Sequence, residues 1–167
     1  MNPPRYYQIE IYPFYIQQAI DAKSVLCHSG LSLAELAHRI ENTEWDIYLG
    51  QRALTSDDCR LKTFRHTMPE CRSQVVSEIS AAWEQVQTLS EDVPYSIDKQ
   101  AVSNALERIK KEMLDGYDIF ILESMKYRVK KILTDDGDFA GVAGLCVFTA
   151  NRKVIDLAKS QGRLLNR

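Results

Sequence analysis

Residues 69–91 carry the feature that most constrains this fold, a long run with the apolar spacing of one helix face. Apolar residues recur at steps of four, three, four and three, which is the pattern of an amphipathic α-helix. Pro69 suits the first turn, where its missing N–H costs nothing. Because the apolar stripe must be covered, other elements have to pack against it. The stripe consists of Val75, Ile79, Ala82, Val86 and Leu89.

Shorter helical patterns recur through the rest of the chain, so the sequence predicts an all-α fold. We expect an irregular bundle of six to eight helices around the long central helix at about 69–91, with residues 14–167 forming a single helical domain. Residues 139–150 suit either a buried helix or a strand, and their helical neighbours favour a helix. The other predicted helices cover residues 14–28, 32–40, 45–49 (a short helix ending near Gly50), 55–67, 97–115, 118–132 and 154–161.

The first 13 residues differ from the rest, because apolar and polar side chains alternate over residues 5–12 until Pro13 interrupts them. Alternation predicts a short strand, so residues 1–13 are expected to form an extended N-terminal arm. The arm either covers the helical core or binds a partner, since tyrosine is enriched at interfaces. The candidate partner-binding residues are Tyr6, Tyr7, Tyr12 and Tyr15.

Composition describes an ordinary globular chain of 167 residues with a net charge of −2. The charge is uneven: residues 1–96 carry 8 basic and 13 acidic side chains, for a net −5, and the remainder carries +3. The four cysteines have no metal-ligand spacing, and the longest apolar run, 139–148, is too short to span a membrane. We therefore expect a cytoplasmic protein without a metal or cofactor.

Arg60 and His66 are separated by five residues, a spacing that resembles the Arg-x4–6-His motif of HEPN-type helical ribonucleases. The resemblance implies that His66 would act in acid–base catalysis on a ribose 2′-hydroxyl and that Arg60 would steady the phosphate. The helical character of the chain agrees with that family.

A basic segment in the C-terminal half suggests a second alternative, binding to nucleic acid. Clustered cations bind the phosphate backbone, and an aromatic ring among them can stack on a base. A solvated helix face explains the same residues without a ligand. The candidates are Lys126, Tyr127, Arg128, Lys130, Lys131, Arg152 and Lys153.

An acidic turn follows this basic segment. Asp135, Asp136 and Asp138 resemble a fragment of a calcium loop, but the later ligands and the closing glutamate are absent, so no metal site is predicted. Because the sequence contains no recognisable set of catalytic residues, enzymatic activity is uncertain and a non-enzymatic role is favoured. The leading hypothesis is a protein–protein interaction module, such as an adaptor, an inhibitor or a small subunit, that binds a protein partner or itself.

Overall fold

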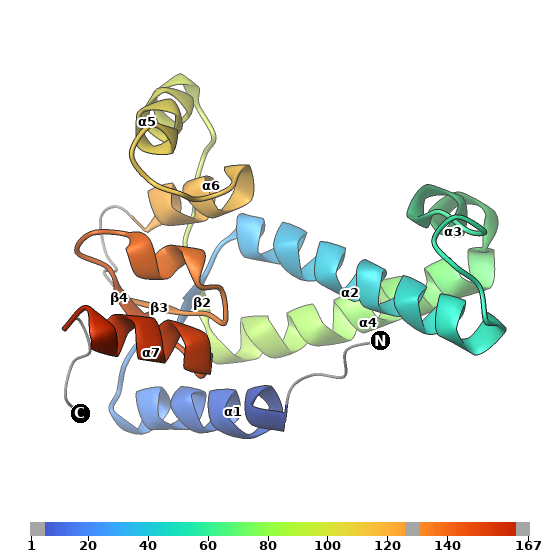
Figure 1. Cartoon of the computed structure of the whole chain (residues 1–167), viewed down its shortest axis with the longest axis horizontal. Coiled ribbons are helices and arrows are strands. Elements are labelled where there is room, and N and C mark those ends of the chain that lie inside the picture. The colour runs from blue at the N-terminus through green and yellow to red at the C-terminus, as the bar shows by residue number, and fades with distance from the viewer. Residues whose placement is uncertain (1–5, 126–130, 163–167) are drawn as a thin grey trace. The chain divides into compact units, whose positions relative to one another are not determined.

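The structure is a computed structural model that describes residues 6–125 and 131–162 (Figure 1). The chain divides into two compact units, and each is described by itself. Unit 1 contains Val25–Val93, and unit 2 contains Pro4–Ser24 and Pro94–Arg167.

The described residues form seven α-helices with only short strands between them. This confirms the predominantly helical character that the sequence predicts. The arrangement of all helices in one bundle around residues 69–91, and the single domain over residues 14–167, stay predictions.

Unit 1 is built on two long helices, α2 (Gly30–Arg52) and α4 (Pro69–Leu89), with the short α3 (Leu61–Thr67) packed on both (Figure 1). The long helix predicted over residues 69–91 is confirmed as α4. Two residues of its predicted stripe face the core: Val75 is fully buried, and Ile79 packs against the core cluster. The stripe is less completely covered at its end, where Leu89 is half exposed. The core of the unit consists of Tyr48, Leu49, Cys59, Phe64 and Val75.

The first long helix begins at Ser29, whose side chain and that of Ser32 bond reciprocally to each other's backbone N–H groups. This capping box starts one continuous helix of 23 residues, so the predicted end near residue 40 is wrong. Gly50 lies inside the helix, and the chain turns at Ala53 in the left-handed conformation. The prediction for residues 55–67 was also too long, because residues 55–58 form a turn closed by Asp58.

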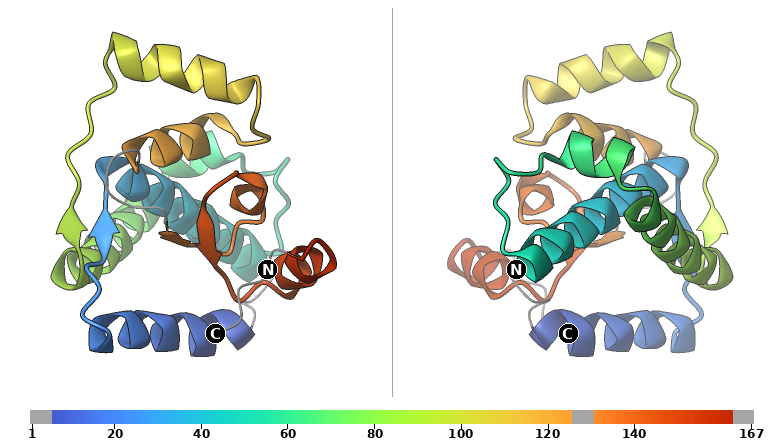
Figure 2. Two further views of the ribbon diagram at one scale, coloured as in Figure 1. Left: turned by 90° about the vertical axis from the view of Figure 1, so that its left-hand side faces the viewer. Right: turned by 90° about the vertical axis from the view of Figure 1, so that its right-hand side faces the viewer.

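A short parallel pair, β1 (Cys27–His28) and β2 (Glu91–Asp92), joins the start of α2 to the end of α4. Figure 2 shows the two arrows side by side. His28 bonds Ser90 (Nδ1–Oγ, 2.9 Å) and meets the edge of Trp83, with ring centroids 4.9 Å apart. These contacts fix both ends of the unit's chain to each other.

A buried carboxylate connects the three helices of unit 1. Glu41 on α2 is 6% exposed and accepts hydrogen bonds from Arg65 on α3 and Arg72 on α4. The Arg65 Nε–Glu41 Oε1 distance is 2.7 Å, and the hydrogen bond from Arg65 holds the pKa of the Glu41 carboxyl below its usual value, with a smaller contribution from the charge of Arg72. One carboxylate therefore ties three elements together.

Unit 2 combines α1 (Tyr6–Asp21), α5 (Lys99–Ile109), α6 (Gly116–Ser124) and α7 (Arg152–Ser160) with two strands and a 3-10 turn. Its core centres on Ile119, which is fully buried. Glu123 of α6 is buried too and pairs with Arg108 of α5. The cluster of buried apolar residues is Ala105, Leu114, Ile119, Leu122, Phe139 and Val142.

The expected extended arm is wrong from residue 6 onward, because these residues begin α1. The helix carries Pro13 in its interior, which normally costs about 3 kcal/mol. Tertiary bonds offset this cost: Gln8, Tyr12 and Tyr15, spaced by four and three, lie on one helical face and bond residues 134–135 and 149. Extended backbone would place the first two of these side chains on one face but not the third.

Two further helix predictions fail where strands form. β3 (Lys131–Leu133) replaces the end of the predicted helix 118–132, and β4 (Cys146–Phe148) lies inside 139–150, after the 3-10 helix η1 (Asp138–Gly141). The strands pair in parallel, with Ile132 opposite Val147. Both of these β-branched side chains pack against the core cluster, which is the environment that favours them in strands.

The stripe that predicts α5 is real but points outward. The small Ala101 and Ala105 face the core, while the larger apolar side chains stay exposed to solvent. Val102, Leu106 and Ile109 are spaced by four and three residues, which is typical of a helix that packs against another helix. We call these three exposed residues the α5 stripe; Met113 is exposed too but follows the end of the helix.

Within residues 6–125 and 131–162, no helix combines the length and the hydropathy needed to cross a membrane.

We predict that Glu41→Gln lowers the free energy of unfolding of unit 1 by about 1–3 kcal/mol at pH 7, because the arginine bonds to a buried carboxylate are lost. Since the folded-state pKa lies below the ordinary value of 4.5, this contribution is complete above pH 4.5 and is lost as the pH falls through the folded-state pKa. Urea unfolding at several pH values measures it.

The matched control is Glu35→Gln, which breaks the exposed pair with Arg39 and should cost under ~0.5 kcal/mol. A stability difference between wild type and Glu41→Gln that grows toward low pH would contradict the assignment.

Candidate metal centre

The parallel pair β3–β4 determines where polar side chains gather in unit 2. Thr134 extends the pairing by donating its N–H to the Phe148 carbonyl (3.0 Å). The carboxyl ends of parallel strands meet at one edge, and open α/β sheets bind their ligands there. The polar residues that follow the two strands are Thr134, Asp135, Asp136, Thr149 and Asn151.

Asp118 approaches this edge from the first turn of α6. Asp115 caps that helix, accepting bonds from the N–H groups of Tyr117 and Asp118. The next side chain, Ile119, is fully buried in the core. A rigid cap on one side and a buried anchor on the other hold the Asp118 backbone in place, and its carboxylate is half-buried.

Asp136 and Asp138 come from the turn after β3. The Asp136 N–H donates to the Thr134 hydroxyl (3.1 Å), and the Asp138 N–H donates to the Asp136 carboxylate (2.9 Å). Phe139, which is buried in the core cluster, anchors the end of the turn. Local bonds and one aromatic anchor therefore fix both carboxylates.

These two segments bring three carboxylates together. One oxygen each from Asp118, Asp136 and Asp138 lies within 4.8 Å of the others; two of the residues are half-buried and Asp138 is exposed. Carboxylates this close repel one another, and a cation between them relieves the repulsion. The arrangement can hold a metal ion and leaves one side open to solvent.

Asp135, next to the cluster in the chain, bonds α1. Its carboxylate accepts bonds from Gln8 (2.7 Å) and the Tyr12 hydroxyl (2.8 Å). The same hydroxyl accepts the Ala150 N–H (3.2 Å). Burial raises the pKa of Tyr12, and the bonds with Thr149 and Ala150 partly oppose the shift.

Positive charge lies at the start of α7, which follows β4. The Asn151 side chain caps this helix and donates to the Asp135 carbonyl (3.1 Å). Arg152 and Lys153 follow directly, and both are exposed. Two of the sequence-predicted nucleic-acid residues therefore lie at the same sheet edge as the acidic cluster, whereas Lys131 begins β3 at the opposite end of the strand.

The other predicted site residues are placed as follows. Arg60 precedes α3 and His66 lies in its last turn; both are exposed, and Phe64 is the α3 side chain that enters the core. The ribonuclease roles of Arg60 and His66 stay predictions.

Among the predicted partner-binding tyrosines, Tyr12 and Tyr15 form hydrogen bonds within unit 2. The remaining candidates, namely Lys126, Tyr127, Arg128, Lys130 and the side chains of Tyr6 and Tyr7, lie outside the described residues.

Sequence reasoning missed the contribution of Asp118. The predicted helix 118–132 would have put Asp118 and the acidic turn at opposite ends of a rod about 20 Å long. The signal that could have located the site is the strand-like Ile132-Leu133 ending at acidic residues, a pattern that places carboxylates at the carboxyl end of a parallel strand.

Comparison with known proteins gives no relative: no protein-family model, no curated protein and no solved structure matches this chain.

We predict that Tyr12→Phe lowers the free energy of unfolding of unit 2 by about 1–3 kcal/mol, because the buried Ala150 N–H and the Asp135 carboxylate lose a partner. Chemical denaturation followed by circular dichroism measures the change. The control is Tyr117→Phe, an exposed hydroxyl on α6 that should matter by less than ~0.5 kcal/mol. Equal stabilities for the two variants would refute the role assigned to Tyr12.

Proposed function

We propose that this protein binds a divalent cation at Asp118, Asp136 and Asp138 and uses it to hydrolyse phosphodiester bonds in nucleic acid. The observation that supports the proposal is the convergence of three carboxylate oxygens within 4.8 Å from two separate segments.

The ligand atoms favour a hard cation. All three are carboxylate oxygens, the donors that suit magnesium, manganese and calcium rather than zinc or copper. Magnesium in particular is commonly held by a few carboxylates together with water and substrate phosphate. The solvent-exposed side at Asp138 leaves space for such additional ligands.

A cation in this position supports hydrolysis of a phosphate ester. A divalent cation held by Asp118, Asp136 and Asp138 would lower the pKa of a bound water and polarise a phosphoryl oxygen. The water oxygen would form a bond to phosphorus while the bond from phosphorus to the leaving sugar oxygen breaks, and the proton that the water loses would go to that leaving oxygen. No electron donor or acceptor is needed, in keeping with a site made of carboxylates.

The neighbouring cations support an anionic polymer as substrate. Arg152 and Lys153 are exposed at the first turn of α7, next to the Asn151 that contacts the acidic turn. Basic side chains that flank a metal centre can bind phosphates on either side of the scissile bond. In this proposal, basic residues of the C-terminal half bind the nucleic acid, as the sequence alternative predicts, and the metal site cleaves it.

We predict that manganese binds the purified protein with one-to-one stoichiometry and that Asp136→Asn weakens binding by at least ~100-fold, since even outer-shell partners of metals are worth 10–100-fold. Titration calorimetry measures binding. Fluorescein-labelled single-stranded RNA and DNA, incubated with magnesium or manganese, report cleavage.

Asp156→Asn on α7 is the matched control, an exposed aspartate outside the cluster. Cleavage should need the metal, stop with EDTA, fail in Asp136→Asn and persist in Asp156→Asn. Absence of manganese binding at millimolar concentration would refute the site, and cleavage that survives Asp136→Asn but fails in His66→Ala would favour the Arg60–His66 alternative.

A second candidate function, protein–protein interaction, is supported by the α5 stripe rather than by the tyrosines. Leu106 and Ile109 are each more than half exposed. The steps of four and three from Val102 to Ile109 are those of a two-helix seam. The interaction we propose is self-association, with the α5 stripes of two copies packed together.

We predict that the wild-type protein sediments as a dimer at about 100 µM, a concentration at which weak dimers form. Leu106→Glu should sediment as a monomer and keep the melting temperature of the wild type. Gln100→Glu adds the same charge on an exposed position of α5 outside the stripe and should remain dimeric. A monomeric wild type, or a dimeric Leu106→Glu, would exclude this interface.

A further inference from the structure

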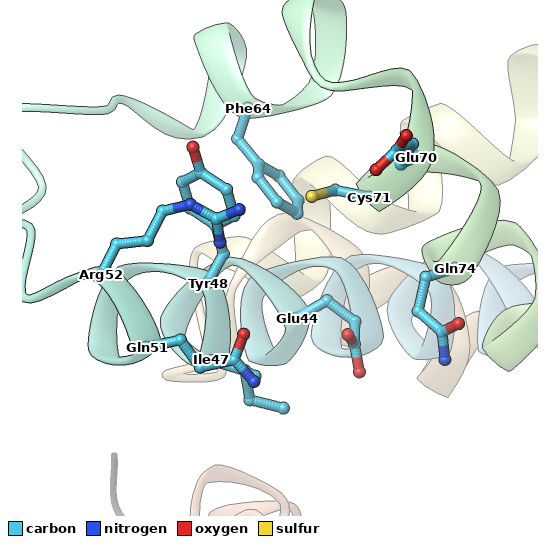
Figure 3. A pocket seen from close by; sticks show the side chains of 9 residues that line it. All are labelled: Glu44, Ile47, Tyr48, Gln51, Arg52, Phe64, Glu70, Cys71 and Gln74. Carbon is cyan, nitrogen blue, oxygen red and sulfur yellow. The ribbon is translucent and has the colours of Figure 1, made fainter.

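Unit 1 contains an open pocket of about 420 Å³ between α2, α3 and α4, remote in sequence from the acidic cluster of unit 2. Figure 3 shows its lining from close by. The volume is in the range of small-ligand and side-chain pockets. The lining residues are Glu44, Ile47, Tyr48, Gln51, Arg52, Phe64, Glu70, Cys71 and Gln74.

The floor of the pocket is apolar and rigid. Phe64 and Tyr48 are almost fully buried, with ring centroids 5.3 Å apart, and both belong to the core of unit 1. Cys71 packs against the same core. A floor of this kind suits the aliphatic part of a ligand.

The floor already accepts a guanidinium group. The guanidinium carbon of Arg52 lies 4.2 Å from the centre of the Tyr48 ring, and in Figure 3 the Arg52 side chain lies alongside that ring. Aromatic faces attract cations through their quadrupole. The chain's own Arg52 therefore occupies the Tyr48 face, and the acidic part of the lining is what remains for a ligand cation.

The rim carries negative charge that unit 1 does not neutralise. Glu44 projects from α2 and Glu70 from the first turn of α4. Among the described residues, neither carboxylate takes part in a hydrogen bond or an ion pair, whereas Glu41 is bonded by two arginines and Glu35 by Arg39. Residues 25–93 contain 6 basic and 11 acidic side chains, which gives unit 1 a net charge of −5 over this range.

We propose that this pocket binds a basic side chain, arginine above all, of a partner peptide. The aliphatic stem lies on the floor, and the guanidinium meets the carboxylates of Glu44 and Glu70. Arginine suits the site better than lysine, because its planar fork bonds carboxylates. The side-chain amide of Gln51 offers hydrogen bonds to the peptide backbone, whereas the Gln74 amide already donates to Glu78.

The expected affinity is modest. The carboxylate of Glu70 is exposed, and an exposed ion pair is worth roughly a twofold to fivefold change in binding. Two carboxylates together should therefore favour a charged ligand over a neutral one of the same shape by about fivefold to twentyfold. This ratio, rather than the absolute affinity, tests the proposal.

The probe is a capped hexapeptide with one central arginine between leucines, and the matched probe carries citrulline, which has nearly the same shape and no charge. Proton–nitrogen correlation spectra of the full-length protein follow both titrations at low salt. We expect the amide signals of residues 44–52, 64 and 70–74 to shift, and the arginine peptide to bind about fivefold to twentyfold more tightly.

The double variant Glu44→Gln/Glu70→Gln should bind both peptides equally weakly, while Glu84→Gln/Glu91→Gln, which removes two exposed acids elsewhere in unit 1, should keep the preference. Thermal melting verifies that both variants fold. Equal binding of the two peptides by wild type, no shift at millimolar peptide, or shifts confined to other acidic surfaces would overturn the proposal.

Discussion

The pairing of β3 with β4 is the interaction on which unit 2 depends. Three residues pair on each strand, too few to be stable without surrounding contacts. Those contacts come from three directions: the core cluster around Ile119 packs on one face, Tyr12 bonds the segment after each strand, and Asn151 caps α7 while reaching Asp135. The pairing in turn fixes the sheet edge where the acidic cluster forms. A change that disrupts the pairing should therefore affect both the stability of unit 2 and the geometry of the cluster.

Unit 1 depends on a different arrangement. The stripe of α4 provides the apolar contacts, and Glu41 fixes how the helices are oriented against one another. Apolar burial is non-directional and tolerates helix sliding, whereas a carboxylate with two arginine partners fixes which turn of α2 faces α3 and α4. The pocket lies between the same three helices. The shape of its floor is therefore a product of the core packing, and its charge is a property of the rim.

The sequence predicted helices best where one face is buried continuously, as in α4, because periodicity records burial. It failed where a tertiary contact overrides a local pattern. Residues 6–13 alternate like a strand yet form a helix, since only the helix lets Tyr12 and Tyr15 bond the segment at 149. The spacing over 118–132 predicts a helix that runs through Ile132, whereas Lys131–Leu133 form a strand whose pairing partner, β4, lies 13 residues further on. The sequence also did not predict that Asp118 joins the acidic cluster, because the cluster combines two segments whose contact has no characteristic spacing in the sequence.

Asp135 and Asp136 are neighbours in the chain with different surroundings. Asp135 accepts bonds from Gln8 and Tyr12 of α1, whereas Asp136 lies in the acidic cluster with Asp118 and Asp138. Loss or gain of a single residue between β3 and the turn would move both carboxylates out of these positions. The length of this short segment therefore matters to unit 2 as much as the identity of its residues.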